Sequence, residues 1–167
     1  MEVVANTTIL SNFASAGRLD VLREVLGKLH LPAEVYAEIQ EGLLAGYEFY
    51  TGIAAQIHPF SPTGWLRLVS FAGDEELRLF EELSANLGRG EAASLALAMH
   101  RGWGFLSDDA RARNVSRNHG VSPAGTLGVL LKAVKTDVLS VAQANEVLHQ
   151  MIGSGYRSPY DNLAELL

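Results

Sequence analysis

The chain has 167 residues, of which 48% are hydrophobic and 19% charged. This length fits about one domain, and the composition excludes a disordered tail, a collagen-like chain and a coiled-coil rod. The absence of cysteine excludes disulfides, cysteine-ligated metals and a cysteine nucleophile. Because the net charge is −6, a broad basic face for nucleic acid is also excluded, and RNA or DNA would need a local basic strip.

No apolar run approaches the ~20 residues that a membrane-spanning helix requires. The first residues, Met1 to Ala5, carry no basic region of the kind that begins a secretory signal. We therefore expect no membrane association and a cytoplasmic location.

The first half of the chain begins with a predicted strand at 3–5, followed by a helix at 9–16 for which Thr7 or Thr8 is the expected N-cap. Further predicted elements follow in order: a helix at 18–26 ended by Gly27, a strand at 29–31 and a helix at 32–44. From 46 to 64 the pattern is weak. This region supplies candidates for an exposed apolar interface, namely Tyr47, Phe49, Tyr50 and Ile53.

The second half continues the alternation of strands and helices. A strand at 65–71, expected near a sheet edge, precedes a charged helix at 74–87 and an almost wholly apolar helix at 91–100. After a strand at 103–107, helices are predicted at 109–119, 124–134, 140–152 and 159–167. This order predicts an α/β fold of three layers, α/β/α, with a central, mostly parallel twisted sheet. We interpret 1–167 as a single domain, with a core at 1–135 and a C-terminal helical extension at 136–167.

Polar side chains follow two of the predicted strands. Ligands of such sheets bind beyond the carboxyl ends of the strands, which directs attention to Asn6 after the first strand and to Asp108 and Asp109 after the strand at 103–107. The alternative for the two aspartates is a helix N-cap and a first-turn charge.

Two glutamates extend this set. Glu91 stands at the head of an apolar helix, where a carboxylate loses hydration and needs a cation, a metal or hydrogen-bond donors; the alternative is that it only complements the helix dipole. On the helix at 32–44, Glu38 lies closer to the apolar stripe than Glu34 or Glu41, so it is the carboxylate expected to enter a cleft.

These oxygen donors form a hard, imidazole-poor set. The histidines show no metal-ligand spacing, and no phosphate-binding loop or nucleophilic serine motif is present. Oxygen ligands suit Mg²⁺ or Mn²⁺, and such ions in carboxylate clusters commonly support hydrolysis of phosphodiesters. The expected ligands are Asn6, Glu91, Asp108 and Asp109.

Nearly the whole chain resembles the PIN-domain superfamily, the fold of metal-dependent ribonucleases that includes VapC-like toxins. The segments that carry the resemblance are Val3–Leu10, Gly17–Leu22, Leu31–Ile39, Gly88–Ala98, Leu106–Arg113 and Gly125–Leu131. Carried over by position, Glu38, Glu91 and Asp109 fall on the family's metal-site acids, with Asp108 beside them. The resemblance implies an endoribonuclease that uses Mg²⁺ or Mn²⁺, in which these three acids are the catalytic residues and Glu38 orients or deprotonates water.

The resemblance also implies an RNA substrate and a small antitoxin protein as partner. A homodimer is expected on separate grounds, because exposed apolar candidates between Leu43 and Trp65 are typical of an interface; the alternative is that this segment folds back on its own core. Arg113 falls where this branch keeps a basic residue near the site. Arg111, Arg113 and Arg117, together with Thr8 and Thr126, are the expected substrate contacts; the alternative for the arginines is a solvated helix face.

One position departs from the pattern of active nucleases, which usually carry Asp where this chain has Asn6. An amide oxygen can bind a metal but brings no charge. The alternative function is therefore a weakened or inactive PIN-fold module that binds nucleic acid or protein. A phospho-acceptor domain of the response-regulator type is a third possibility, disfavoured because its acid pair belongs after the first strand.

Overall fold

The computed structural model describes residues 1–167 and contains one six-stranded sheet in the order β3-β4-β2-β1-β5-β6. Every strand pairing is parallel, as the sequence predicts. The strands are β1 (Val3–Ala5), β2 (Leu29–Pro32), β3 (Ile57–His58), β4 (Leu66–Val69), β5 (Gly104–Leu106) and β6 (Pro123–Ala124). The two-residue strands β3 and β6 were not predicted, because two residues are too few to show the alternation of apolar and polar side chains that indicates a strand. They form the two edges of the sheet.

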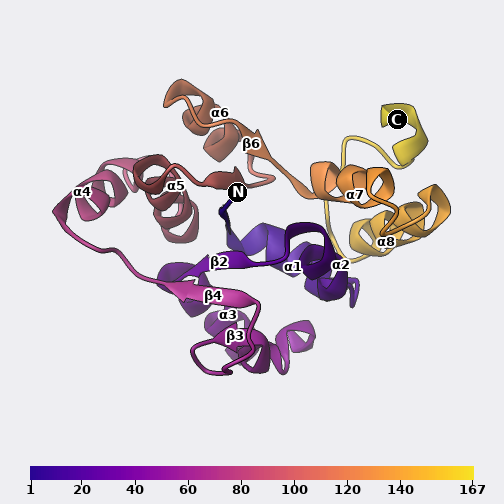
Figure 1. The fold of residues 1–167 in the computed structure, drawn as a ribbon, viewed down its shortest axis with the longest axis horizontal. Helices are drawn as coiled ribbons and strands as arrows, with labels where there is room; N and C mark the ends of the chain where they lie inside the picture. Colours follow the sequence, from indigo (N-terminus) through magenta and orange to yellow (C-terminus); the bar gives the residue numbers. More distant parts are fainter.

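Alternating side chains of the central strands separate two apolar cores. In β1, Val4 packs in one cluster and Ala5 in the other, and in β5 the same division separates Phe105 from Leu106. A strand with both faces buried places successive side chains in opposite layers. The larger cluster takes residues from α1, α2, α3, α7 and α8, and the smaller cluster from α4, α5 and α6, which gives the predicted three layers (Figure 1).

The helices agree with the predicted segments to within a few residues. They are α1 (Thr7–Ser15), α2 (Leu19–Leu26), α3 (Ala33–Leu44), α4 (Asp74–Leu83), α5 (Arg89–Arg101), α6 (Ala110–Asn118), α7 (Thr126–Lys135) and α8 (Val141–Gly153). The predicted final helix at 159–167 is only a short 3₁₀ turn, η3 (Leu163–Leu166). No helix is long and apolar enough to span a bilayer.

The weakly patterned region from 46 to 64 folds back onto the core in part. Two 3₁₀ turns, η1 (Glu48–Tyr50) and η2 (Ile53–Gln56), place Tyr50 and Ile53 inside, each 3% exposed. The expectation that these two side chains are exposed is therefore wrong. Tyr47 and Phe49 do remain exposed.

The segment after residue 135 packs onto the rest of the chain. Apolar residues of α8 and η3 are buried in the larger cluster, where α8 lies beside α7 and α1 (Figure 1). After α8, residues 154–157 and 159 line a cavity together with Asp108 and Asp109, which follow β5, and η3 then contacts α7 and α8.

Candidate functional site

The carboxyl edge of the sheet has a topological switch point between β1 and β5. The chain leaves β1 for β2 on one side and later returns to β5 on the other, so the turns after β1 and β5 diverge. Ligands of parallel sheets bind at such a point. Asn6 follows β1, and Ser107, Asp108 and Asp109 follow β5.

Asn6 is 1% exposed and serves as the N-cap of α1. Its Oδ1 accepts a hydrogen bond from the Ile9 N–H at 3.4 Å, and its Nδ2 donates to Ser107 Oγ at 2.9 Å. The expectation that Thr7 or Thr8 caps this helix is wrong, because the helix already begins at Thr7. Both polar ends of the Asn6 amide are thus engaged within the protein.

Glu38 reaches from α3 to the head of α5. Its Oε1 accepts a hydrogen bond from the Gly90 N–H at 2.9 Å, and its Oε2 accepts one from the Thr7 hydroxyl. The approach requires glycine at position 90, since a Cβ there would lie 2.7 Å from Glu38 Oε2. Glu41 is exposed on α3, whereas Glu38 is half-buried and contacts Thr7 and Gly90.

Glu91 and Asp109 each begin a helix. Glu91, the third residue of α5, accepts from the Gly88 N–H at 3.2 Å, and Asp109 caps α6 by accepting from the Ala112 N–H at 2.8 Å. Burial raises the pKa of Glu91, and the negative charges of Asp109 and Glu38 raise it further, against the opposing Gly88 hydrogen bond. Glu91 is therefore within electrostatic range of the other two acids expected from the sequence.

Asp108 points away from these acids. Its Oδ1 accepts from the Thr126 N–H at 2.9 Å, and its Oδ2 accepts from the Thr126 hydroxyl at 2.5 Å and from Asn12 Nδ2 at 3.1 Å. Thr126 is fully buried, which places it beneath the site and out of reach of a substrate. Asp108 thus joins the β5–α6 turn to α1 and α7.

The three arginines of α6 do not form one strip. Arg111 donates to the Asn86 carbonyl at 3.3 Å, and its positive charge lowers the pKa of Glu91 slightly against the effects that raise it. Arg113 donates to the Ser107 carbonyl at 3.0 Å and lines a cavity together with Thr8. Arg117 is exposed and makes no side-chain hydrogen bond within the protein.

This cavity has a volume of about 820 Å³ and lies beside the acids. It is bounded by α1, by the turn into α7 and by residues 154–159, and Asp109 belongs to its wall. Asp109 is the one acid shared by the cavity and the site, since Glu38 and Glu91 do not line the cavity.

Several residues that build the site were missed in the sequence. Thr7 holds Glu38, Asn12 holds Asp108, and Ser107 accepts from both Asn6 and the Asp109 N–H. The sequence could have indicated a buried polar role for Asn12, because this polar residue lies between the apolar residues Leu10 and Phe13 of one short helix.

The oxygen donors are of the kind that binds a hard cation, but no group of three or more acidic or histidine side chains is placed so that it could hold a metal ion. Mg²⁺ is commonly held by one or two carboxylates plus water and substrate phosphates rather than by an all-protein cage. Glu91 and Asp109, whose charges interact, meet that requirement. Asn6 would have to release its hydrogen bond from Ile9 to contribute as an additional ligand.

Comparison with protein families agrees with the fold. A family model described as PIN domain matches residues 2–167. The chain belongs to the PIN-domain family. Searches with the chain found no similar curated protein and no similar solved structure. PIN domains are generally metal-dependent nucleases, so membership supports a nuclease-type hydrolase and rules against the phospho-acceptor alternative.

Proposed function

We propose that this PIN domain is an endoribonuclease that requires Mg²⁺ or Mn²⁺. The observation that carries the proposal is the position of Glu91 at the switch point of a PIN fold, where the charges of Asp109 and Glu38 both raise its pKa. We place the activity in the cytoplasm, to which a chain without cysteine is suited.

The residues have distinct parts in this proposal. Glu91 and Asp109 would hold the divalent ion, which when bound polarises the phosphodiester and lowers the cost of forming hydroxide. Glu38, fixed at two points by Thr7 and Gly90, presents its remaining lone pairs to the attacking water and accepts its proton. Arg113, held by the Ser107 carbonyl, neutralises charge on the RNA backbone beside the acids.

The test is cleavage of a single-stranded RNA in the presence of Mn²⁺ by the whole chain and by variants that change only charge. Asp109→Asn keeps the N-cap of α6, because asparagine caps as well as aspartate. Glu91→Gln keeps an acceptor for the Gly88 N–H. We expect each to lower kcat/KM at least a hundredfold without loss of stability.

Glu41→Gln is the matched control, since Glu41 is an exposed carboxylate on the same helix as Glu38. It should retain full activity. Cleavage that survives in Asp109→Asn and Glu91→Gln, or that persists in excess EDTA, contradicts the proposal.

A specific observation favours a second candidate function, a binding module without efficient catalysis. Asn6 supplies no charge to the site, and both ends of its amide are engaged in the protein. Under this alternative the folded chain binds RNA or protein but cleaves no RNA at any Mg²⁺ or Mn²⁺ concentration.

We further propose that the ribonuclease is the toxin of a toxin–antitoxin pair. The support is the resemblance to VapC-like proteins over nearly the whole chain. Expression of the chain should arrest growth, Asp109→Asn should abolish the arrest, and co-expression of a short neighbouring reading frame should relieve it. Normal growth during accumulation of folded, active protein contradicts the toxin role.

We also propose a homodimer formed through exposed apolar residues at the end of α3 and just after it. Leu44 is 90% exposed, Tyr47 57% and Phe49 38%, and such patches commonly mark interfaces. Light scattering should give twice the chain mass, and Leu44→Lys should give the monomer. Leu77→Lys is the control, because Leu77 is an exposed leucine on α4. A monomer at all concentrations rules out this assembly.

A further inference from the structure

One wall of the 820 Å³ cavity is the polar face of α1. Thr8, Ser11, Asn12 and Ser15 line it, and their spacing of three, four and seven residues puts them on one side of a helix. The hydroxyls of Ser11 and Ser15 each donate to a carbonyl of the preceding turn at 3.0 Å. Because each hydroxyl proton is already used, these oxygens can offer a ligand only acceptor lone pairs.

The opposite wall is the turn after α8. Gly155 has φ +113°, which reverses the chain, and the Tyr156 N–H donates to the Met151 carbonyl at 3.0 Å. Tyr156 and Arg157 then line the cavity. Burial raises the pKa of Tyr156 to about 12, and the charge of Asp108 adds to this, so the phenol keeps its proton at neutral pH.

Two guanidinium groups line this cavity, and so do two carboxylates, those of Asp108 and Asp109. Arg113 and Arg157 both line it, and neither forms an ion pair in the protein. The nearby Asp108 is instead satisfied by Thr126 and Asn12. In a chain of net charge −6, two unpaired guanidiniums at one cavity favour an anionic ligand such as phosphate.

We propose that this cavity is a ribonucleotide subsite, in which Arg113 and Arg157 bind a phosphate and the α1 hydroxyls accept from the ribose 2′-OH. The inference rests on the proposed function, because Asp109 belongs both to the cavity and to the acid cluster and so places the subsite next to the cleaved bond. The 2′-OH is the donor that distinguishes RNA from DNA. Residues 154–159 are then part of substrate recognition.

The test measures binding of nucleoside 5′-monophosphates to the whole chain in EDTA, by changes in amide NMR spectra. AMP, CMP, GMP and UMP are compared with their 2′-deoxy forms and with inorganic phosphate. We expect at least one ribonucleotide to shift the amides of Gly125, Gly155 and Tyr156 and to bind more tightly than its deoxy form and than phosphate. Arg157→Gln should weaken it at least tenfold, and Ser11→Ala should remove the preference over the deoxy form.

Arg23→Gln is the matched control, because Arg23 is an exposed, unpaired arginine on α2 outside the cavity. It should change the Kd less than twofold. The subsite is ruled out if no nucleotide binds there, if phosphate alone binds as tightly, or if Arg157→Gln binds like the control. It is also ruled out if an acidic peptide, but no nucleotide, shifts these amides, since the cavity would then be a protein-docking site.

Because EDTA removes the divalent ion that cleavage requires, the binding experiment tests the subsite independently of the proposed nuclease activity. Nucleotide binding that depends on Arg157, in a protein that cleaves no RNA with Mn²⁺, supports the subsite and contradicts the nuclease. If the protein cleaves RNA with Mn²⁺ but its nucleotide affinity is unchanged by Arg157→Gln, the nuclease is supported and the subsite is overturned.

Discussion

Asn6 and Ser107 are 101 residues apart in the chain, and the Asn6 amide donates a 2.9 Å hydrogen bond to Ser107 Oγ. The same Oγ accepts from the Asp109 N–H at 3.1 Å. The two turns at the switch point are therefore joined by one side chain, and that side chain also helps to position Asp109.

Asn6→Asp should increase both metal binding and cleavage. Aspartate retains the N-cap of α1 and can accept from the Ser107 hydroxyl, so the fold is preserved. Two unit charges ~4 Å apart interact by about 4 kcal/mol at an effective dielectric near 20, and a fraction of this tightens Mn²⁺ binding at least tenfold. Calorimetry measures the affinity, and RNA cleavage with Mn²⁺ should rise in parallel.

The control is the double variant Asn6→Asp/Asp109→Asn, in which cleavage should vanish. If Asn6→Asp is folded but neither binds Mn²⁺ more tightly nor cleaves RNA, the acids of this site are not arranged for a cation. The binding-module alternative would then be preferred.

Gly90→Ala should impair catalysis while leaving the fold intact. The added Cβ would lie 2.7 Å from Glu38 Oε2, and the end of that flexible side chain can move aside. Because Glu38 loses its fixed position, we expect kcat to fall at least tenfold, with an unchanged midpoint of urea unfolding. Full activity in a folded Gly90→Ala would show that the position of Glu38 does not matter for the reaction.

Replacing either of two glycines near the start of α7 by alanine should change the free energy of unfolding, in opposite directions for the two positions. At Gly125 a Cβ would overlap Asp108 Oδ1 and lie 3.0 Å from Arg113 Nη1, so Gly125→Ala should destabilise the protein by about 1–3 kcal/mol. At Gly128 the nearest side-chain atom is 3.7 Å away, and Gly128→Ala should stabilise the helix by about 0.5–1 kcal/mol. Urea unfolding measures both, and equal effects would contradict the close packing at Gly125.

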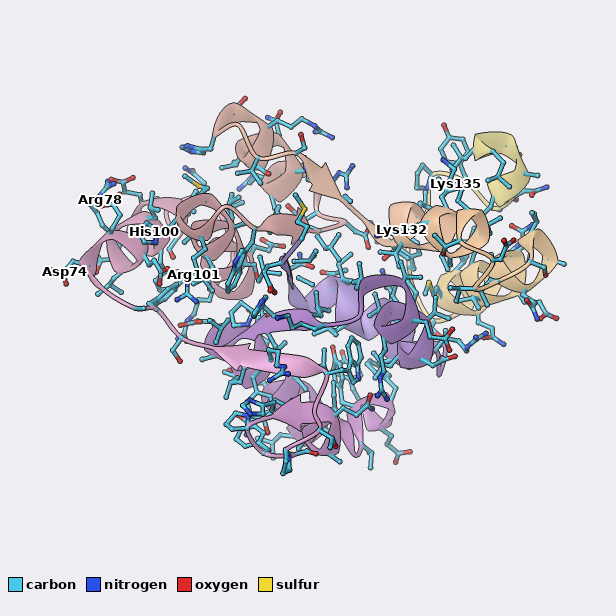
Figure 2. All side chains as sticks on the ribbon, viewed as in Figure 1. Asp74, Arg78, His100, Arg101, Lys132 and Lys135 are labelled. Atoms are coloured by element: carbon cyan, nitrogen blue, oxygen red, sulfur yellow. The ribbon has the colours of Figure 1, made fainter.

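Stability at low pH should depend on Glu76 of α4, which is 1% exposed. It accepts from Arg101 Nε at 2.6 Å and contacts His100 Nδ1 at 3.0 Å, and Figure 2 labels both partners where α5 lies against α4. The hydrogen bond from Arg101 is the main reason why the pKa of Glu76 falls from 4.5 to about 2. A lowered pKa in the folded state stabilises the protein above pH 4.5.

This stabilisation is lost as the pH falls from about 4.5 to about 2, and the pKa difference corresponds to at most about 3 kcal/mol. Glu76→Gln cannot titrate, so its free energy of unfolding should fall less steeply over this range than that of the native chain. Parallel pH profiles of the two proteins would show that Glu76 is not the group responsible.

The layers of the fold could be predicted from the sequence because they depend on local periodicity. Short apolar segments alternate with helical patterns, and such an order forms a parallel sheet covered on both faces. The same reasoning selects the candidate site, since the carboxyl ends of parallel strands meet at one edge. It also selected Glu38 over Glu41, because the direction of a side chain on a helix follows from its spacing.

What only the tertiary structure decided is which of several chemically equal residues faces the site. Asp108 and Asp109 are adjacent carboxylates, yet Asp108 binds Thr126 and Asn12 while Asp109 caps α6. The directions of their side chains depend on where α1 and α7 pack, and this packing cannot be predicted from the local sequence. Arg157 likewise lies at the cavity because the chain returns there after α8. Long-range packing brings such residues together, and periodicity describes only a helix or strand with its own neighbours.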